Sequence, residues 1–598
     1  MEGVCVVAHP RHSMSSLGTF VWSIADQLRG VYKPHQYGDV ILPMTILRRL
    51  DSILDGSRDT VRKIVESTES DELRDALVKR ETGLSFFYAS PWTFPRLLGD
   101  PQGLEANLVD YLAGFSKNID VFERFRFEQE IRQLAEKNRL LLVVQKFGEV
   151  DLHPDRVSNA EMGDLFEELI RKFADASNET AGEHFTPRDA IRLMVDLLFA
   201  EDSDGLTEPG VIRSVYDPTA GTGGMLSVAE DHLVGSPEHP GLNPDARLVL
   251  FGQEINDQSY AICKSDMIAK GQDASNIRLG DTLANDLFPG QTFDFVLSNP
   301  PYGADWKASQ AAVKAHVQDA GEHSRFAGGL PPISDGQMLF LQHVASKMRP
   351  AHQGGGRAGI VLNGSPLFTG AAESGPSEIR RWLLENDLVD AIVAMPTNMF
   401  YNTGIATYIW ILDNTKPADR IGSVQLIDGS KFFTKMRKSL GQKNREVSSD
   451  DRTRIVELYN NHAETEHSKT VRTDEFGYWT ITVERPLRDE SGEIVRDRKG
   501  AAKPDAKLRD TENVPFTYDG NALGAAGRDA TIARYFDAEV KPHVEDAWID
   551  AAKTKVGYEI PFTRMFYVYT PPRPLEEIDR DLNTLVGEIM ELLREVER

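Results

Sequence analysis

Residues 215–226 read VYDPTAGTGGML: a short apolar stretch that ends at Asp217, a glycine-rich turn, and the start of a helix. Gly221, Gly223 and Gly224 permit backbone angles and close approaches that a side chain would forbid. Such a turn places a helix N-terminus and free N–H groups at the carboxyl end of a strand, where α/β folds bind ligands. The stretch predicts a strand–turn–helix unit at a ligand site, although a tight connection without a ligand explains a lone glycine-rich turn equally well.

Two acidic side chains and the spacing of the glycines narrow the class of ligand. The glycines follow neither the dinucleotide-binding nor the P-loop pattern, and Asp217 would repel phosphate but suit a cationic or amine-bearing ligand. Glu254 ends the next apolar run, LVLFGQE, where a carboxylate can accept hydrogen bonds from ribose hydroxyls. Asp281, in LGDTLAND, can accept from an adenine amine. A solvent-exposed strand end and an ordinary Gly-Asp turn remain the plainer explanations of these two.

A second motif, NPPY, follows the apolar run FDFVLS and spans Asn299 to Tyr302. Pro300 and Pro301 have no N–H to donate, so they end a strand and lock the backbone. The side-chain oxygen of Asn299 and the following carbonyl can then face one amine group, which has two hydrogens to donate. Tyr302 offers a flat face for stacking. The motif predicts a pocket for a flat, amine-bearing molecule, and its alternative is a rigid strand stop.

Short apolar runs alternate with helical stretches around both motifs: VIRSVYDP, ARLVLFGQE, FDFVLSNPP, RAGIVLNG, LVDAIVAMP and TYIWILDN. This alternation is typical of an α/β fold, a parallel-type sheet with helices on both faces. Only TNMFYNTGIA joins the last two runs, and it is too short for a helical crossover. We therefore expect those two strands to be antiparallel.

Four segments follow from these patterns: a helical domain over 1–178, the α/β domain over 179–485, a charged loop and mixed segment over 486–570, and a C-terminal helix over 571–598. Within the third segment, the charged stretch up to Pro515 is expected to be an exposed loop. The C-terminal helix has apolar residues at alternating spacings of three and four, the seam of a short coiled coil. They are Leu575, Ile578, Leu582, Leu585, Ile589, Leu592 and Val596.

The formal net charge of −25 over 598 residues constrains the partners. A protein that holds nucleic acid over a wide face is normally basic, because phosphate contacts dominate the affinity. If this chain acts on DNA, it needs local basic patches or a partner that supplies most of the contacts. One basic patch is present, and a solvated basic face is its alternative explanation. Its members are Lys431, Lys435, Arg437, Lys438, Lys443 and Arg445.

The two cysteines, Cys5 and Cys263, supply neither a disulfide framework nor a metal cluster, so no metal is expected. No apolar run approaches the roughly 18 residues that span a bilayer, and the first residues are not those of a signal peptide. We expect a cytoplasmic protein without a membrane partner. Translation can start at Met1 or Met14.

The two motifs, in this order and spacing, resemble those of methyltransferases that use S-adenosyl-L-methionine (AdoMet) and act on amino groups. Further stretches resemble the modification (M) subunits of type I restriction–modification systems over nearly the whole chain. They include LGTFVWSIADQLRG, YGDVILPMTILRRLD, GEHFTPRDAIRLMVDLL, MPTNMFYNTGIATYIWIL and EFGYWTITVERPL. NPPY alone is shared with enzymes that act on proteins and RNA, whereas the combination is specific. The resemblance implies a Rossmann-like class I AdoMet methyltransferase sheet with a helical N-terminal domain and a C-terminal helical tail.

The resemblance also assigns roles to individual residues. The catalytic tetrapeptide matches Asn299, Pro300, Pro301 and Tyr302. The AdoMet-binding positions match Glu183, His184, Phe185, Thr186, Pro187, Arg188, Asp217, Thr219, Ala220, Gly221, Gly223, Glu254 and Asp281. Phe400 or its neighbour Tyr401 lies where related enzymes place an aromatic ring against a flipped base, and the sequence does not choose between them.

The implied reaction transfers a methyl group from AdoMet to the N6 amine of adenine in double-stranded DNA. Asn299 and Pro300 would accept both amine hydrogens, and the base would be flipped out of the duplex and stacked on Tyr302. The implied partners are DNA, a specificity subunit with two M subunits for each, and a motor–nuclease restriction subunit. The alternatives are an amide or RNA methyltransferase with an NPPY site, and an idle scaffold in a defence complex. The DNA sequence that is recognised, the preferred methylation state of the DNA and the exact stoichiometry stay open.

Overall fold

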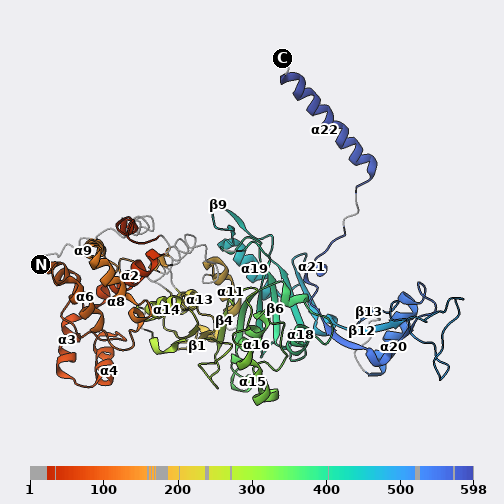
Figure 1. The fold of residues 1–598 in the computed structure, drawn as a ribbon, viewed down its shortest axis with the longest axis horizontal. Coiled ribbons are helices and arrows are strands. Elements are labelled where there is room, and N and C mark those ends of the chain that lie inside the picture. Colours follow the sequence, from red (N-terminus) through yellow and green to blue (C-terminus); the bar gives the residue numbers. More distant parts are fainter. Residues whose placement is uncertain are drawn as a thin grey trace. The chain divides into compact units, whose positions relative to one another are not determined.

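The computed structural model describes residues 20, 23–33, 36–157, 161–162, 165–166, 169, 186–200, 203–235, 241–269, 272–401, 403–518, 525–569 and 573–596. The chain divides into two compact units, 1–560 and 561–598. The first unit contains a helical region and a large sheet, and the second contains the C-terminal helix (Figure 1). The finer division into four segments remains a prediction.

The N-terminal region is helical, as its apolar spacing predicts. Its helices are α2 (Tyr37–Leu54), α3 (Arg58–Ser67), α4 (Asp71–Thr82), α5 (Phe94–Gly99), α6 (Leu104–Ala113), α7 (Val121–Arg124), α8 (Phe127–Glu136) and α9 (Leu140–Gly148). Leu47 and Tyr111 are fully buried in the core that these helices share. α14 (Asp257–Ala269) adds Ala261 and Ile262 to the same core, so the helical region packs directly on a helix of the α/β region.

The sheet has nine strands in the order β11-β8-β6-β7-β5-β4-β1-β2-β3. They are β1 (Ile212–Asp217), β2 (Arg247–Glu254), β3 (Ile277–Leu279), β4 (Phe295–Ser298), β5 (Arg357–Asn363), β6 (Val389–Ala394), β7 (Thr407–Asp413), β8 (Ser423–Asp428) and β11 (Ser468–Arg472). β3, β2, β1, β4 and β5 are parallel neighbours. β7 is antiparallel to both β5 and β6, which confirms the antiparallel pair predicted from the short connection.

Helices cover both faces of the sheet. On one face, α11 (Arg188–Ala200), α13 (Gly224–Leu233) and α19 (Ser449–Asn461) share a core with Leu297 and Val361. Side chains alternate between the faces of a strand, so the buried neighbours Val296 and Ile360 point the other way. There α16 (Gln337–Lys347) contacts β4 and β5, and α18 (Gly375–Glu385) packs against α16. Other α-helices among the described residues of the first unit are α12 (Ser203–Leu206), α15 (Gln310–Ala320), α17 (Ser365–Phe368) and α20 (Ala525–Tyr535).

Two smaller sheets lie outside the main one. β9 (Thr434–Leu440) and β10 (Lys443–Glu446) form a two-stranded hairpin. β12 (Gly477–Glu484) pairs with β13 (Asp510–Pro515), β14 (Trp548–Ile549) and β15 (Lys555–Tyr558). The prediction of an exposed loop up to Pro515 is therefore wrong for its last residues. β13 is charged and mostly exposed, but its backbone completes the hydrogen bonding of β12, which composition alone does not reveal.

The second unit contains α21 (Phe562–Met565) and α22 (Leu575–Val596). α22 confirms the predicted C-terminal helical tail, and its seam residues Leu575, Leu582 and Ile589 are exposed. Among the described residues, no helix has both the length and the apolar composition needed to cross a bilayer.

Candidate active site

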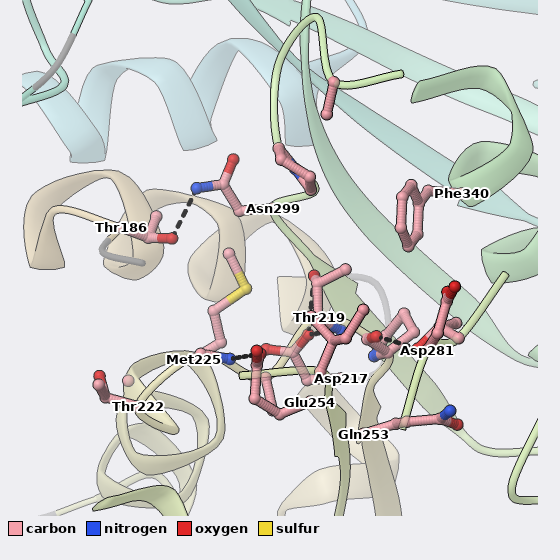
Figure 2. Close-up of a pocket in the computed structure, with 18 of the residues that line it drawn as sticks. Thr186, Asp217, Thr219, Thr222, Met225, Gln253, Glu254, Asp281, Asn299 and Phe340 are labelled. Atoms are coloured by element: carbon pink, nitrogen blue, oxygen red, sulfur yellow. Dashed lines mark hydrogen bonds between the residues drawn. The ribbon is translucent and has the colours of Figure 1, made fainter. Parts of the chain in front are cut away.

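The predicted site positions follow the carboxyl ends of four neighbouring strands. β4, β1, β2 and β3 are adjacent and parallel, so their carboxyl ends meet at one edge of the sheet. Asp217 ends β1, Glu254 ends β2, Asp281 lies two residues after β3, and Asn299 follows β4. Figure 2 shows these four side chains around one pocket. The order of strands in the sheet gathers residues that lie far apart in the sequence.

The glycine-rich turn has the backbone geometry that its composition predicts. Gly221 and Gly223 have φ angles of +53° and +85°, in the left-handed region, and Gly223 is the N-cap of α13. A Cβ on Gly223 would lie 2.9 Å from the sulfur of Cys263, so a side chain there would collide with α14. The Ala220 N–H donates to the carbonyl of Gln253 at 3.0 Å, which ties the turn to the end of β2.

Asp217 is buried beneath the turn, with 1% of its surface exposed. The backbone N–H and the hydroxyl of Thr219 both donate to its Oδ1, at 2.9 and 3.2 Å. Burial raises the pKa of Asp217 to about 7; the charge of Glu254 adds to the rise, and the two hydrogen bonds from Thr219 oppose it. A cation bound nearby would favour the ionised carboxylate, so this side chain suits a positively charged ligand.

The carboxylate of Glu254 joins the two turns at this edge of the sheet. Its Oε2 accepts from the N–H of Gly221 at 2.8 Å, and its Oε1 accepts from the N–H of Asn256 at 2.7 Å. These two backbone hydrogen bonds hold the orientation of the Glu254 carboxylate, which lines the pocket.

Asp281 is held in the same way. Its Oδ1 accepts from the N–H of Leu283 at 2.9 Å, and its Oδ2 accepts from the hydroxyl of Ser309 at 2.5 Å. The next residue, Thr282, donates its hydroxyl to the carbonyl of Pro218 at 2.6 Å. The turn after β3 is thereby fastened to the turn after β1, and both acidic side chains are positioned before any ligand arrives.

Both ends of the Asn299 amide are hydrogen bonded. Its Nδ2 donates to the hydroxyl of Thr186 at 2.7 Å, and its Oδ1 accepts from the hydroxyl of Tyr302 at 2.7 Å. Figure 2 shows the first of these bonds at the mouth of the pocket. Burial raises the pKa of Tyr302 well above its ordinary value, so the phenol keeps its proton. The tetrapeptide therefore presents a fixed amide beside an aromatic ring.

Of the two aromatic candidates, Phe400 lies against the tetrapeptide. Its ring centroid is 5.9 Å from that of Tyr302, at an interplanar angle of 88°. Phe400 is buried, whereas Tyr401 is half-buried and its carbonyl accepts from the N–H of Gln442. Tyr302 and Phe400 form one aromatic corner.

A cavity of about 310 Å³ connects the two motifs. Many of the predicted site residues line it: Thr186, Arg188, Asp217, Thr219, Ala220, Gly221, Glu254, Asp281, Asn299 and Pro301. Pro187, Gly223, Pro300 and Tyr302 adjoin the motifs but are not among its lining residues. Glu183, His184 and Phe185 lie outside the described residues.

Several lining residues were not found by the sequence motifs. Met225 extends from α13 toward the middle of the pocket, and Phe340 faces it from α16 (Figure 2). Trp306 and Ser309 follow the tetrapeptide and close the wall near Asp281. An aromatic ring a few residues after NPPY is a signal for Trp306, but no sequence signal distinguishes Phe340 from an ordinary core residue.

The basic patch loses one of its predicted members. Lys443 is buried, and its Nζ forms an ion pair with Asp189 at 2.9 Å. It also donates to the carbonyl of Arg445. Lys443 is therefore an anchor inside the protein and not part of a basic surface.

Comparisons with known proteins agree with this geometry. A family model described as N-6 DNA Methylase matches residues 157–484, and one described as the HsdM N-terminal domain matches residues 17–147. The methylase subunit of the type I restriction enzyme MjaIX from Methanocaldococcus jannaschii is 25% identical over 433 residues, which are 69% of this chain and 72% of that protein. The MpnII methylase subunit from Mycoplasma pneumoniae is 24% identical over 528 residues, 80% of this chain and 90% of that protein.

The same type of protein is found among solved structures. The crystal structure of a type I restriction–modification system methyltransferase subunit from Streptococcus thermophilus superposes with a TM-score of 0.58 at 25% identity. The match covers 78% of this chain and 97% of that one.

The fold and the site at its strand ends define an α/β methyltransferase. Because the N-6 DNA Methylase model matches more than half of the chain, at residues 157–484, the chain belongs to that family. It is an adenine-specific DNA methyltransferase of the type I methylase-subunit kind. The predicted family, fold class and activity are confirmed, and nothing supports the amide, RNA or scaffold alternatives.

Proposed function

We propose that the cavity holds AdoMet and that Asn299 to Tyr302 hold the target adenine at its mouth. The observation that carries the proposal is the gathering of Asp217, Glu254 and Asp281 around one cavity that reaches Asn299. AdoMet carries a transferable methyl group on a sulfonium sulfur.

The donors and acceptors of the cavity fit such a molecule. Glu254 and Asp281 line the cavity, and carboxylate oxygens are suitable acceptors for ribose hydroxyls and an adenine amine. The buried Asp217, with its raised pKa, gains from a nearby positive charge. The cavity of about 310 Å³ lies at the lower end of the size range of small-molecule sites.

We propose that the tetrapeptide activates the adenine amine. The amine is a poor nucleophile, because its lone pair is delocalised into the ring. Asn299 Oδ1 and the carbonyl of Pro300 accept the two amine hydrogens and stabilise the positive charge that builds on the nitrogen. Fixed dipoles of this kind stabilise a transition state without having to reorganise.

The hydrogen bond from Tyr302 to Asn299 has a consequence for the order of events. The phenol now donates to Oδ1, which is the acceptor that the adenine amine requires. When the adenine arrives, its amine replaces the Tyr302 hydroxyl as the donor to Asn299 Oδ1. The Tyr302 ring, which packs against Phe400, is then available for stacking on the base. Thr186 holds the other end of the amide throughout.

The variant Asn299→Ala tests the assignment. It should abolish methyl transfer to DNA and leave the dissociation constant of AdoMet within about twofold, measured by calorimetry. The variant Asp281→Asn should instead affect AdoMet binding. We expect it to weaken AdoMet binding by about tenfold, which corresponds to the loss of one hydrogen bond to a charged group. Wild-type methylation by Asn299→Ala would contradict the proposal.

We further propose that the chain assembles with a specificity subunit, two M subunits for each, and with a motor–nuclease restriction subunit. The net charge of −25 leaves much of the DNA contact to a partner. The exposed apolar seam of α22 suits a helical partner: Leu582 is 54% and Ile589 is 55% exposed.

The tail can be tested separately from catalysis. Leu582→Lys with Ile589→Lys should abolish copurification with the partner subunits and leave AdoMet binding unchanged. The matched control is Glu588→Lys, which introduces the same side chain at an exposed acidic position of the helix. Copurification of the double variant at the wild-type yield would contradict the docking role.

A further inference from the structure

The β9–β10 hairpin carries positive charge in an acidic protein. Thr434–Leu440 and Lys443–Glu446 pair antiparallel, and most of β9 is exposed. The hairpin lies at the margin of the first unit in the view of Figure 1. The chain as a whole has 67 basic against 92 acidic residues, so a cluster of lysine and arginine departs from its composition.

Hydrogen bonds fasten the hairpin to the segment that contains Phe400. The N–H of Gln442 donates to the carbonyl of Tyr401 at 2.9 Å, and the N–H of Asn444 donates to the carbonyl of Asn398 at 3.1 Å. The Arg445 guanidinium donates to the hydroxyl of Thr397 at 3.0 Å. Three hydrogen bonds therefore join the hairpin to residues 397–401.

A second anchor ties the hairpin to α11. Lys443 Nζ lies 2.9 Å from a carboxylate oxygen of Asp189 and is 5% exposed. The same carboxylate accepts from the N–H of Val447, just after β10. Because the pair is shielded from solvent, salt screens it less than a surface pair.

Both anchors lie close to the catalytic tetrapeptide. Phe400, in the first anchored segment, packs against the ring of Tyr302. Asp189, the second anchor, is three residues from Thr186, which is bonded to Asn299. The hairpin is thus fixed to chain segments that adjoin Phe400 and Thr186, the residues in contact with Tyr302 and Asn299.

Lys435 and Arg437 are two of the charges that this framework leaves available. Both are exposed, and neither forms an ion pair with a carboxylate in the described part of the chain. They are two apart on β9, so they share one face of the hairpin. Arg445 lies opposite Lys435 on the neighbouring strand. Its guanidinium carbon lies 4.2 Å from the centroid of the Phe433 ring.

We propose that this face of the hairpin binds phosphates of the DNA backbone beside the flipped adenine; the proposal rests on the proposed function of the tetrapeptide. Base flipping requires that the duplex be held on either side of the extruded nucleotide. Phosphates attract unpaired lysine and arginine side chains, and arginine can bind one with two parallel hydrogen bonds. The anchors make the phosphate contact and the aromatic corner one rigid unit.

The test variant combines Lys435→Glu with Arg437→Glu. It is compared with a control variant that has the same change of charge. The control is Arg498→Glu with Lys499→Glu, two exposed residues on an arm that pairs with itself at Arg496 and Ala502. The affinity of each full-length chain for a fluorescent 30-base-pair duplex is measured by anisotropy at several salt concentrations. AdoMet binding is measured in parallel by calorimetry.

The slope of log affinity against log salt is negative. Loss of two phosphate contacts should make it shallower by about 2, because each contact contributes about 0.9 to its steepness. The control should keep the wild-type slope, and all chains should bind AdoMet equally. An equal loss in both variants would reveal only a net-charge effect and overturn the proposal. So would an unchanged slope in the test variant, or a wild-type chain that does not bind the duplex.

Two further outcomes separate this proposal from its foundation. If the wild-type chain transfers no methyl group to DNA but the test variant still makes the slope shallower, the proposed function fails and the phosphate contact stands. If the test variant loses copurification with an acidic partner protein and keeps its slope, the hairpin binds protein and the proposal is overturned.

Discussion

The side-chain amide of Asn299 donates a 2.7 Å hydrogen bond to the hydroxyl of Thr186, 113 positions earlier in the chain. The bond determines which way the amide faces, because the nitrogen is the end that points at Thr186. Thr186 therefore positions the Asn299 amide, and this role adds to the AdoMet contact that its motif predicts.

Thr186→Val keeps the shape of the side chain and removes the hydroxyl. We expect kcat for DNA methylation to fall about fivefold, since one net hydrogen bond contributes about 1 kcal/mol. The dissociation constant of AdoMet should change less than kcat, and Thr186→Ser should restore the rate. A loss in Thr186→Ser without a loss in Thr186→Val would show that the methyl group, not the hydroxyl, is what matters.

The ring and the hydroxyl of Tyr302 have separable roles. Tyr302→Phe removes the donor to Asn299 and keeps the stacking face, so kcat/KM should stay within about threefold of wild type. Tyr302→Ala should lose at least about tenfold, because stacking on an aromatic contributes about 1–3 kcal/mol for each base. Steady-state methylation kinetics distinguish the two roles. A tenfold loss of kcat/KM in Tyr302→Phe would mean that the phenol itself takes part in catalysis.

Asp217 makes the stability of the protein depend on pH. Its pKa is about 7 in the folded protein against an ordinary 3.8. Burial thus favours the protonated form, and this contribution to stability is complete below 3.8 and lost as the pH rises through about 7. Asp217→Asn cannot lose this contribution. Thermal denaturation should therefore show that the Tm of the variant rises relative to that of wild type as the pH increases from 3.8 to about 7. A Tm difference that is the same at all pH values would contradict this.

The same ionisation should appear in ligand binding. AdoMet carries a positive sulfonium, so its affinity for the wild-type protein should increase as Asp217 ionises near pH 7. Asp217→Asn should bind more weakly and without this pH dependence, as measured by calorimetry from about pH 6 to pH 8. S-adenosylhomocysteine, which lacks the sulfonium charge, is the control ligand and should show the smaller dependence.

The ion pair of Lys443 and Asp189 supports the hairpin. Lys443→Met leaves Asp189 without its cation, and breaking a buried pair typically costs about 3–5 kcal/mol. We expect a lower Tm and a weaker affinity for duplex DNA together. The double variant Lys443→Met with Asp189→Leu should recover part of the Tm, because no uncompensated charge remains. If Lys443→Met alone had the wild-type Tm, the pair would not be an anchor.

Local patterns predict much of this site correctly. The glycine-rich turn, the acidic ends of β1 and β2, and the prolines after β4 each have a local physical cause that can be read from neighbouring residues. The short connection between β6 and β7 likewise determines their antiparallel pairing. Local charge predicts exposure less well than these patterns predict backbone structure. Lys443 lies in a basic run but is buried against Asp189, and β13 is charged but paired with β12.

The sequence by itself determined the fold class and the two motifs, because backbone freedom, strand ends and periodicity depend on residues close together in the chain. The family followed from the resemblance of its motifs to those of known methyltransferases. Only the tertiary structure decided that Thr186 holds the Asn299 amide, that Phe400 backs Tyr302, and that the hairpin is fastened beside both. These contacts join residues that lie 48 to 113 positions apart in the chain, and the order of strands in the sheet brings them together. Strand order is set by the packing of the whole core, so no short stretch of sequence encodes it.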